Sequence, residues 1–216
     1  MARFGVDDLI ACYRRGVFPM AESREDEELF LVDPEWRCIF PLADFHVPRR
    51  LARTLRSARF AFSVDRCFAD VIDGCAAPAP ERADTWISPH IRMLYLELHR
   101  RGLAHSVETW EHGALAGGLY GVALGGAFFG ESMFSRARDT SKAALVHLAA
   151  RLRVGGFTLL DAQFATPHLE QFGATTISRR AFHQKLAEAL VIRGDFHALE
   201  ERASGAQLLQ SIAQIS

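Results

Sequence analysis

The longest stretch of apolar and small residues in this chain runs from Gly117 to Phe134 without alternating polar positions. A strand with one solvent-exposed face would alternate, so the stretch predicts strands that are buried on both faces. Near its end stands a single carboxylate, Glu131, which Ser132 and Met133 follow. A carboxylate at the end of a buried strand is costly unless it is hydrogen-bonded, paired or used in chemistry. This stretch is therefore the first place to look for a functional site.

Similar patterns predict an alternation of strands and helices along the rest of the chain. Strands are expected at 29–32, 38–40, 60–64, 104–111, 115–124, 126–134 and 157–164, and helices at 6–15, 47–59, 67–75, 89–101, 139–154, 167–173 and from 178 onward. The strand, helix and strand between 126 and 164 favour a parallel pair with a crossover helix. We therefore expect an α+β fold, in which a small N-terminal α/β domain (residues 1–47) packs on a mixed-sheet domain (residues 48–216).

Composition narrows the class of protein. The chain has 216 residues, 49% of them apolar, and a formal net charge of −1, which suits a globular core and excludes a globally basic nucleic-acid coat. No apolar run is long enough for a membrane helix, and the acidic residues near the N-terminus argue against a signal peptide. The four cysteines lack a C-x-x-C spacing, which is typical of reduced thiols in a cytoplasmic protein. The nine histidines have no paired spacing, so we interpret each as a surface or core residue and expect no metal site.

Polar side chains also stand near the end of the strand expected at 157–164. Asp161 and Gln163 are two positions apart, so they point to one face of the strand and can share a hydrogen-bond chain. Open α/β sheets bind ligands outside the carboxyl ends of their strands, where Glu131 is also expected. The alternative is a structural Asp161 that pairs with a neighbouring arginine. The spacing leaves both interpretations open.

The order of hairpin, long strand, loop, helix and strand is also that of an acetyltransferase (GNAT-like) core. Acetyltransferases bind the pyrophosphate of coenzyme A with a glycine-containing loop, whereas the corresponding loop here, Ser135 to Thr140, contains no glycine. We therefore expect the same fold with a different acyl donor and no cofactor. Two alternatives stay open: an N-acetyltransferase that uses acetyl-coenzyme A, and a non-catalytic binding module.

Several blocks of the sequence closely resemble the leucyl/phenylalanyl-tRNA–protein transferases. They are YRRGVFPM (13–20), TWI (85–87), AHSVE.W (104–110), GGLYGVALGGAFFGESMFSR (117–136), SKAAL (141–145), DAQF.T.HL (161–169) and FGA..I.R (172–179). The resemblance implies transfer of leucine or phenylalanine, with methionine as a further candidate, from aminoacyl-tRNA to the α-amine of proteins that begin with Arg or Lys. The product would be marked for degradation. The implied partners are the acceptor arm of an aminoacyl-tRNA and a protein with a basic N-terminal residue, without a membrane or a metal.

The resemblance also implies roles for single residues. Gln163 would contact the attacking amine, Asp161 would supply negative charge through it, and Glu131 would hold the cationic acceptor or the reacting centre. The donor side chain would occupy an apolar pocket, beside Ser132 and Met133, formed by Leu119, Phe128, Leu145, Leu148, Leu152 and Leu160. Trp86 would contact the terminal adenosine of the tRNA. Ordinary core packing is the alternative for Trp86 and for most of the pocket residues.

A basic helix face is a further candidate contact for tRNA. Arg49, Arg53 and Arg56 follow helical spacing in the helix expected at 47–59. Their side of the helix either contacts nucleic acid or is simply solvated.

The chain departs from the family near its N-terminus. Many members carry a pair of tryptophans where this chain has Leu31 and Val32, and another tryptophan in place of Met20. The smaller side chains leave the adenosine contacts, the donor preference and the acceptor range open at this place.

Overall fold

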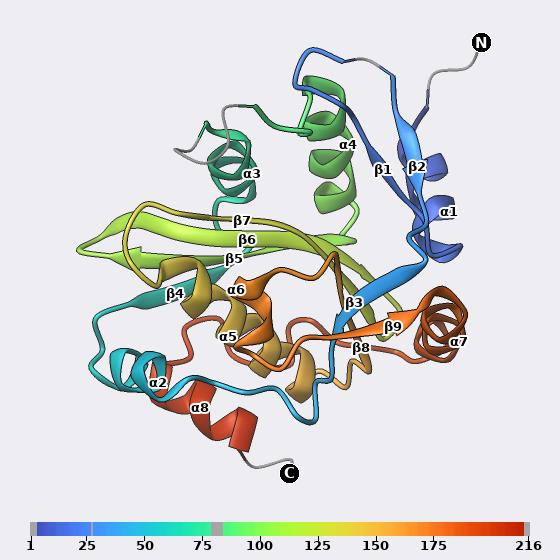
Figure 1. The fold of residues 1–216 in the computed structure, drawn as a ribbon. Helices are drawn as coiled ribbons and strands as arrows, with labels where there is room; N and C mark the ends of the chain where they lie inside the picture. The colour runs from blue at the N-terminus through green and yellow to red at the C-terminus, as the bar shows by residue number, and fades with distance from the viewer. Residues whose placement is uncertain (1–3, 27, 79–83, 214–216) are drawn as a thin grey trace.

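The computed structural model describes residues 4–26, 28–78 and 84–213, and Figure 1 shows their fold. The helices are α1 (Val6–Arg14), α2 (Arg49–Arg56), α3 (Phe68–Ala76), α4 (Pro89–Arg100), α5 (Thr140–Val154), α6 (Pro167–Glu170), α7 (Arg179–Leu190) and α8 (Gly205–Ala213). The strands are β1 (Phe18–Met20), β2 (Phe30–Val32), β3 (Trp36–Phe40), β4 (Ala61–Val64), β5 (Ala104–Glu111), β6 (Ala114–Leu124), β7 (Ala127–Ser135), β8 (Leu159–Gln163) and β9 (Thr175–Ser178). Every strand and helix that the sequence predicts is present, with differences of a few residues at the ends.

The centre of the fold is one mixed sheet in the order β4-β5-β6-β7-β8-β3-β9. Neighbouring strands are antiparallel except β7 and β8, which run parallel with Phe128 opposite Leu160 and Phe129 opposite Asp161. α5 connects these two strands, so the predicted parallel pair with a crossover helix is confirmed. The carboxyl ends of β7 and β8 consequently lie at the same edge of the sheet, which brings Glu131 close to Gln163.

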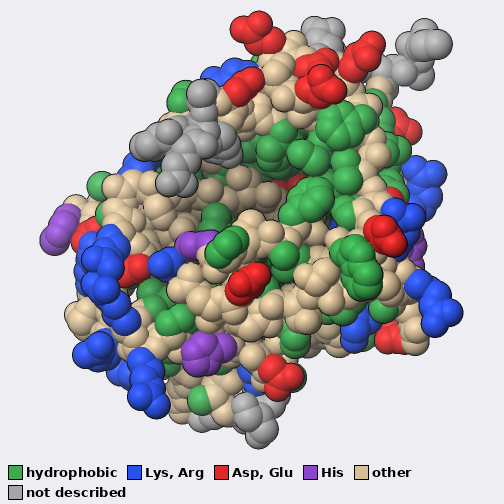
Figure 2. Space-filling view, in the orientation of Figure 1, with side chains coloured by type: hydrophobic (Ala, Val, Ile, Leu, Met, Phe, Trp, Pro, Cys, Tyr) green, Lys and Arg blue, Asp and Glu red, His purple; other side chains and the backbone are tan. Residues whose placement is uncertain are grey.

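The N-terminal segment forms a small unit and then joins the main sheet. α1 contacts α4 and β1, and β1 pairs with β2 in a separate antiparallel sheet. Acidic side chains gather over the connection between β1 and β2 at the top of Figure 2, where Glu22, Glu25 and Glu28 are exposed. β3 then inserts between β8 and β9. The expected α+β class, with a mixed sheet and a small N-terminal domain, is confirmed, whereas the division of the chain after residue 47 stays a prediction.

Each face of the main sheet carries its own apolar core. On one face α5 packs on β5, β6 and β7 and is covered in turn by α2 and α8, which explains why almost every side of α5 is buried. On the other face α3 and α4 pack on the sheet, so these two sets of helices lie on opposite sides in Figure 1. Phe128 belongs to the core with α5, and the next residue, Phe129, belongs to the core with α3 and α4.

Three elements lie outside the sequence predictions. β1 occupies a segment in which the sequence predicts no strand, and β9 is a four-residue edge strand too short for a clear alternation. α8 buries Leu208 and Ile212, one helical turn apart, against α2 and α5, and two apolar positions alone do not distinguish a helix from a loop. Within the described ranges no helix is long and apolar enough to cross a membrane.

Candidate active site

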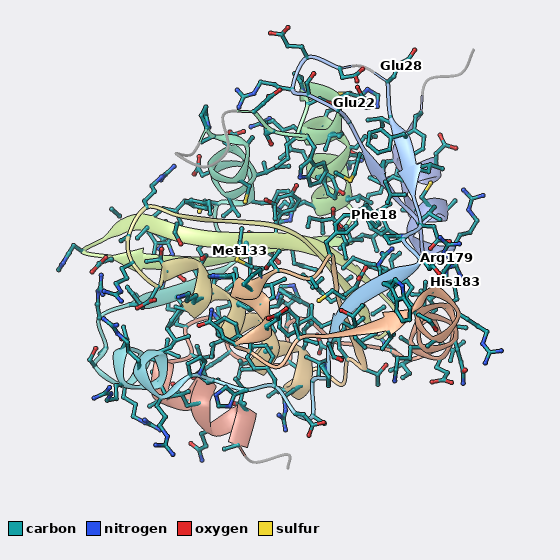
Figure 3. The ribbon with its side chains drawn as sticks, in the orientation of Figure 1. Phe18, Glu22, Glu28, Met133, Arg179 and His183 are labelled. Carbon is teal, nitrogen blue, oxygen red and sulfur yellow. The ribbon has the colours of Figure 1, made fainter. Side chains whose placement is uncertain are left out.

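A cavity of about 250 Å³ lies beside the carboxyl ends of β7 and β8. Most of the side chains that line it are apolar, namely Phe40, Leu119, Met133, Leu145, Leu148, Leu160, Ala162 and Leu169. Figure 3 labels Met133 on β7 at this place. Glu131, Ser132 and His168 are among the polar residues of the wall. The cavity can therefore accept an apolar group next to a carboxylate.

Glu131 is held in this wall by hydrogen bonds. The Tyr95 hydroxyl donates to its Oε2 at 2.8 Å, and Nε2 of Gln163 donates to its Oε1 at 3.0 Å. The hydroxyls of Tyr95 and Tyr13 are in turn hydrogen-bonded at 2.5 Å. Burial raises the pKa of Glu131 to about 7, and the negative charge of Asp161 adds to the rise, while the hydrogen bonds from Tyr13, Tyr95 and Gln163 oppose it. Glu131 can therefore gain or lose a proton near neutral pH.

The two tyrosines keep their protons. Burial, and next the negative charge of Glu131, raise the pKa values of both Tyr13 and Tyr95 well above the ordinary value. Their hydroxyls are consequently permanent donors, which lets them stabilise the ionised form of Glu131.

Asp161 forms a buried ion pair with Arg37. Nε of Arg37 donates to Oδ1 at 2.9 Å and Nη2 donates to Oδ2 at 2.6 Å, with both side chains almost fully buried. The guanidinium also donates to the Gly16 carbonyl and lies between the rings of Phe18 and Phe182, with its central carbon 4.6 and 4.3 Å from the ring centres. Figure 3 labels Phe18 on the N-terminal unit. The arginine partner that the sequence leaves open for Asp161 is therefore Arg37, and the pair joins the N-terminal unit to the sheet.

Gln163 has an unusual backbone conformation. Its φ is +62°, in the left-handed region that costs a non-glycine residue ~1–3 kcal/mol. Two features support it: its N–H donates to Oδ1 of Asp161 at 2.9 Å, and the facing strand β3 has an irregular register between Cys38 and Ile39. The side chain of Gln163 then reaches Glu131. Asp161 thus contacts the main chain of Gln163, and the Gln163 side chain contacts Glu131.

The structure brings most of the predicted pocket residues together. Those that line the cavity are Leu119, Ser132, Met133, Leu145, Leu148 and Leu160, together with Glu131 and Asp161. Phe128 and Leu152 are fully buried but lie outside the lining, and Phe128 stacks on Phe196 instead. Trp86 is partly buried, with its ring edge-on to Tyr95 at 6.4 Å.

The three arginines predicted to contact tRNA lie on the outer side of α2. Arg49, Arg53 and Arg56 are exposed, as is Arg50 beside them. Among the described residues, none of the ion pairs involves any of these four. Figure 2 shows Lys and Arg side chains gathered at the lower left, where Figure 1 places α2. Their charges are thus available to an anionic partner.

Four residues of the site are not predicted from the sequence. Arg37, Tyr13 and Tyr95 come from segments far from β7 and β8 in the sequence, and the one available signal is the charge of Arg37 within the otherwise apolar strand β3. His168 lines the cavity, and its Nε2 is buried without a hydrogen-bond partner. Burial lowers the pKa of His168, so its ring is a neutral polar group that a ligand in the cavity can engage.

The fold is α+β with a mixed sheet, and its site places a carboxylate of near-neutral pKa beside an apolar cavity. These features define a protein that can transfer a proton at a substrate with an apolar group. A family model described as leucyl/phenylalanyl-tRNA protein transferase matches residues 39–187, and the model of the N-terminal domain of that transferase matches residues 3–35. This chain belongs to the leucyl/phenylalanyl-tRNA–protein transferase family.

Curated proteins named leucyl/phenylalanyl-tRNA–protein transferase match the chain from end to end. The protein of Caulobacter vibrioides (strain NA1000 / CB15N) is 60% identical over 99% of this chain and 98% of its own length. The proteins of Phenylobacterium zucineum and Maricaulis maris are 58% and 55% identical, each over 100% of both chains. The resemblance seen in the sequence motifs is thereby confirmed.

Proposed function

We propose that this chain is an aminoacyltransferase, which moves leucine or phenylalanine from aminoacyl-tRNA to the α-amine of an acceptor protein. The names of its relatives state this donor pair, the tRNA and a protein. The observation that supports the proposal most directly is Glu131, a carboxylate with a pKa of about 7 in the wall of an apolar cavity. An apolar amino acid needs such a cavity, and an attacking amine needs such a base.

The reaction requires positioning, removal of one proton from the acceptor ammonium group, and transfer of a second proton from the attacking nitrogen to the leaving oxygen. The ester that joins an amino acid to tRNA is already activated, so no covalent enzyme intermediate is needed. The acceptor nitrogen bonds to the ester carbonyl carbon, the bond from that carbon to the ribose oxygen breaks, and the proton lost by nitrogen ends on the ribose hydroxyl. An α-ammonium group has a pKa of ~7.7–8.0, close to that of Glu131. Glu131 can therefore hold the ammonium group and take its first proton, which passes on to solvent and leaves a neutral amine. It can then carry the second proton from the nitrogen to the ribose oxygen.

Gln163 and Asp161 have separate roles in this proposal. The amide of Gln163 donates to Glu131, which leaves its carbonyl oxygen to accept from the acceptor amine. Asp161 is charge-paired with Arg37 and hydrogen-bonds the Gln163 main chain, so it acts on the amine through the position of Gln163. The proposal thus keeps the role predicted from the sequence, in which Asp161 acts on the amine through Gln163.

The cavity fits the donor side chain. Pockets for drug-sized ligands occupy ~300–1,000 Å³, whereas this one has about 250 Å³, enough for an amino-acid side chain. Its apolar walls discriminate by size and shape, where one methylene is worth ~1–3 kcal/mol. Leucine should therefore be preferred over valine by a modest factor.

Two leucines on α5 offer a matched test of the donor pocket. Leu148 lines the cavity, whereas Leu152, one turn further on, is equally buried but outside the lining. We expect Leu148→Ala to shift donor preference toward phenylalanine or larger side chains, and Leu152→Ala to keep the parent's ranking. Both should lose ~2–5 kcal/mol of stability. The measurement is competition between charged tRNAs for one Arg-initiated peptide, at a temperature where both variants are folded; equal rankings in the two variants would remove Leu148 from the pocket.

An acetyltransferase-like fold is part of the proposal, but acetyl-coenzyme A is not. The loop that would hold the pyrophosphate precedes α5, and two amides at the start of the helix are already engaged: the Thr140 N–H donates to the Ala137 carbonyl and the Ser141 N–H donates to Ser135 Oγ. Asp139 at the same helix end also pairs with the nearby cations that an anion would need, Lys142 at 3.4 Å and Arg138 at 3.7 Å. Bound coenzyme A in the purified protein would favour the alternative N-acetyltransferase.

The acceptor is proposed to begin with Arg or Lys. The exposed Glu22, Glu25 and Glu28 give the N-terminal unit a negative surface that favours a basic acceptor; Figure 3 labels Glu22 and Glu28. Marking of the product for degradation, and a cytoplasmic location, belong to the same proposal. The direct test is an in vitro transfer assay with several charged tRNAs and peptides that begin with Arg, Lys, Asp, Glu or Met. Equal transfer to acidic and basic peptides would reject the acceptor rule.

The acceptor arm of tRNA is proposed to lie against α2, with Trp86 stacking on the terminal adenosine. Base stacking of this kind is worth ~1–3 kcal/mol. Replacing Arg49, Arg53 and Arg56 together by Gln should weaken tRNA binding and reduce its salt dependence by up to ~0.7–0.9 of a logarithmic unit per lost phosphate contact. Binding of the acceptor peptide alone should be unchanged.

A control with the same loss of charge separates local contact from net charge. Arg180, Lys185 and Arg193 are exposed on and after α7, at the opposite side of the molecule from α2 in Figure 1. Their replacement by Gln should leave the salt slope nearly as in the parent. If both triple variants change the slope equally, α2 is a solvated face without a specific role.

A further inference from the structure

Three side chains with metal-ligand chemistry meet outside the Glu131 cavity. Asp65 directly follows β4, His105 lies in β5, and His197 lies between α7 and α8. Nδ1 of His105 is 2.7 Å from Oδ2 of Asp65, and Nε2 of His197 is 3.6 Å from the same oxygen. One ligand atom from each residue lies within 4.8 Å of the other two. Residues from three distant segments thus bring one ligand atom each to the same place.

The surroundings hold this group in place. The ring of His105 stacks on Phe196, with 4.1 Å between ring centres and 14° between planes. Oδ1 of Asp65 accepts the N–H of Ser106 at 2.8 Å, and the N–H of Asp65 donates to the Ser106 carbonyl at 3.1 Å. Contacts of this kind orient ligating side chains, and here they turn Oδ2 of Asp65 toward the two histidines.

The group is accessible from outside. His105 and His197 line a hollow of about 850 Å³, and 55% of the His197 side chain is exposed. An ion can therefore enter, and water can complete its coordination.

We propose that Asp65, His105 and His197 bind a divalent first-row metal ion, for which Zn²⁺ is the best match. Two imidazole nitrogens and one carboxylate oxygen suit Zn²⁺, at bond lengths of ~2.0–2.2 Å in a tetrahedral arrangement whose fourth position can be water. Tetrahedral ligands at these lengths lie ~3.3 Å apart, so the oxygen of Asp65 and Nε2 of His197 already have nearly the required separation. The ion takes the place of the proton shared by Asp65 and His105, whose separation of 2.7 Å must widen by roughly 0.6 Å to reach the tetrahedral spacing. The sequence, in which these histidines are 92 positions apart by their numbers (197 − 105), predicts no such site.

The other charged groups around Asp65 are held by contacts of their own, so they leave the fourth coordination position of the proposed ion open. Nδ1 of His99 is 3.8 Å from Oδ1 of Asp65, but this nitrogen is bonded to the Ala104 carbonyl at 2.8 Å, and the ring stacks on Phe68. Arg151 feels the charge of Asp65, and its guanidinium donates to the carbonyls of Phe196, Leu199 and Glu200. Its positive charge weakens cation binding without blocking it.

Binding would join β4 and β5 to the segment between α7 and α8, and so stabilise the folded state. The test uses the full chain, freed of metal by a chelator and titrated with Zn²⁺ in a calorimeter and with Co²⁺ followed by visible absorption. We expect one equivalent of either ion and a higher Tm with Zn²⁺. The exposed ligand is the one to remove: His197→Ala should weaken binding roughly tenfold or more.

The control is His46→Ala, which changes an exposed histidine outside the group and should bind as the parent does. Absence of saturable binding, or equal affinity of the parent and His197→Ala, would overturn the proposal. Because transfer activity is not a readout, the result is independent of the proposed function.

Discussion

Two glutamates lie in the same sheet, Glu108 in β5 and Glu131 in β7, and their surroundings differ: Glu108 is fully buried, whereas Glu131 is partly buried. Burial raises the pKa of each. Glu108 is fully enclosed and accepts hydrogen bonds from the hydroxyls of Ser63 and Ser106 at 2.6 and 2.5 Å. Glu131 is held by Tyr95 and Gln163, and it forms part of a cavity wall. A shifted pKa is therefore shared by a structural and a candidate catalytic carboxylate, and the adjoining space for a ligand distinguishes them.

The largest expected difference between the two is in the rate of transfer. Glu131→Gln should lower the single-turnover rate by ~10²–10⁴-fold, the usual contribution of a general base, and leave aminoacyl-tRNA binding nearly intact. Glu108→Gln should keep a rate close to that of the parent, because the serine hydroxyls can rotate to serve an amide. The measurement uses leucyl-tRNA and an Arg-initiated peptide. Similar losses in both variants would make Glu131 another structural carboxylate.

The Asp161–Arg37 pair gives the next largest effect, on stability. Asp161→Asn leaves the buried guanidinium of Arg37 without its counter-charge, and breaking a buried pair in this way costs ~3–5 kcal/mol. Urea unfolding should therefore show a large loss, and a second change, Arg37→Met, should recover part of it by removing the orphaned charge. A loss below ~1 kcal/mol, the value typical of exposed pairs, would contradict the structural role assigned to Asp161.

A smaller effect concerns the stability of Glu131→Gln. The folded-state pKa of Glu131 is raised from 4.5 to about 7, so between these pH values the folded protein holds the proton more tightly than the unfolded chain. The contribution of Glu131 to stability is thus present at acidic pH and declines as pH rises through this window. Glutamine does not titrate, so the variant should gain stability relative to the parent between these pH values. A difference in unfolding free energy that is constant with pH would rule out a raised pKa.

The sequence predicts the hairpin, the parallel pair and the place of Glu131, because each depends on local patterns of apolar residues. It does not predict the partners of these residues. Arg37 and Asp161 are 124 positions apart, and they meet because β3 inserts next to β8, a pairing that no local pattern specifies. The left-handed backbone of Gln163 and the approach of Tyr13 to Tyr95 likewise depend on the packing of distant segments. Phe128 has the apolarity expected of a pocket residue and lies in the same core as the pocket leucines, but it stacks on Phe196 and stays outside the lining.

The proposed transfer reaction depends most on Glu131 acting as a base with a near-neutral pKa. The pH dependence of transfer tests this directly. With saturating aminoacyl-tRNA and an Arg-initiated peptide, the rate of the parent should rise with pH around a midpoint near 7, where Glu131 loses its proton. In Glu131→Gln this rise should disappear, leaving only the rise due to the acceptor amine at ~7.7–8.0. A midpoint near 7 that persists unchanged in the variant would contradict the account.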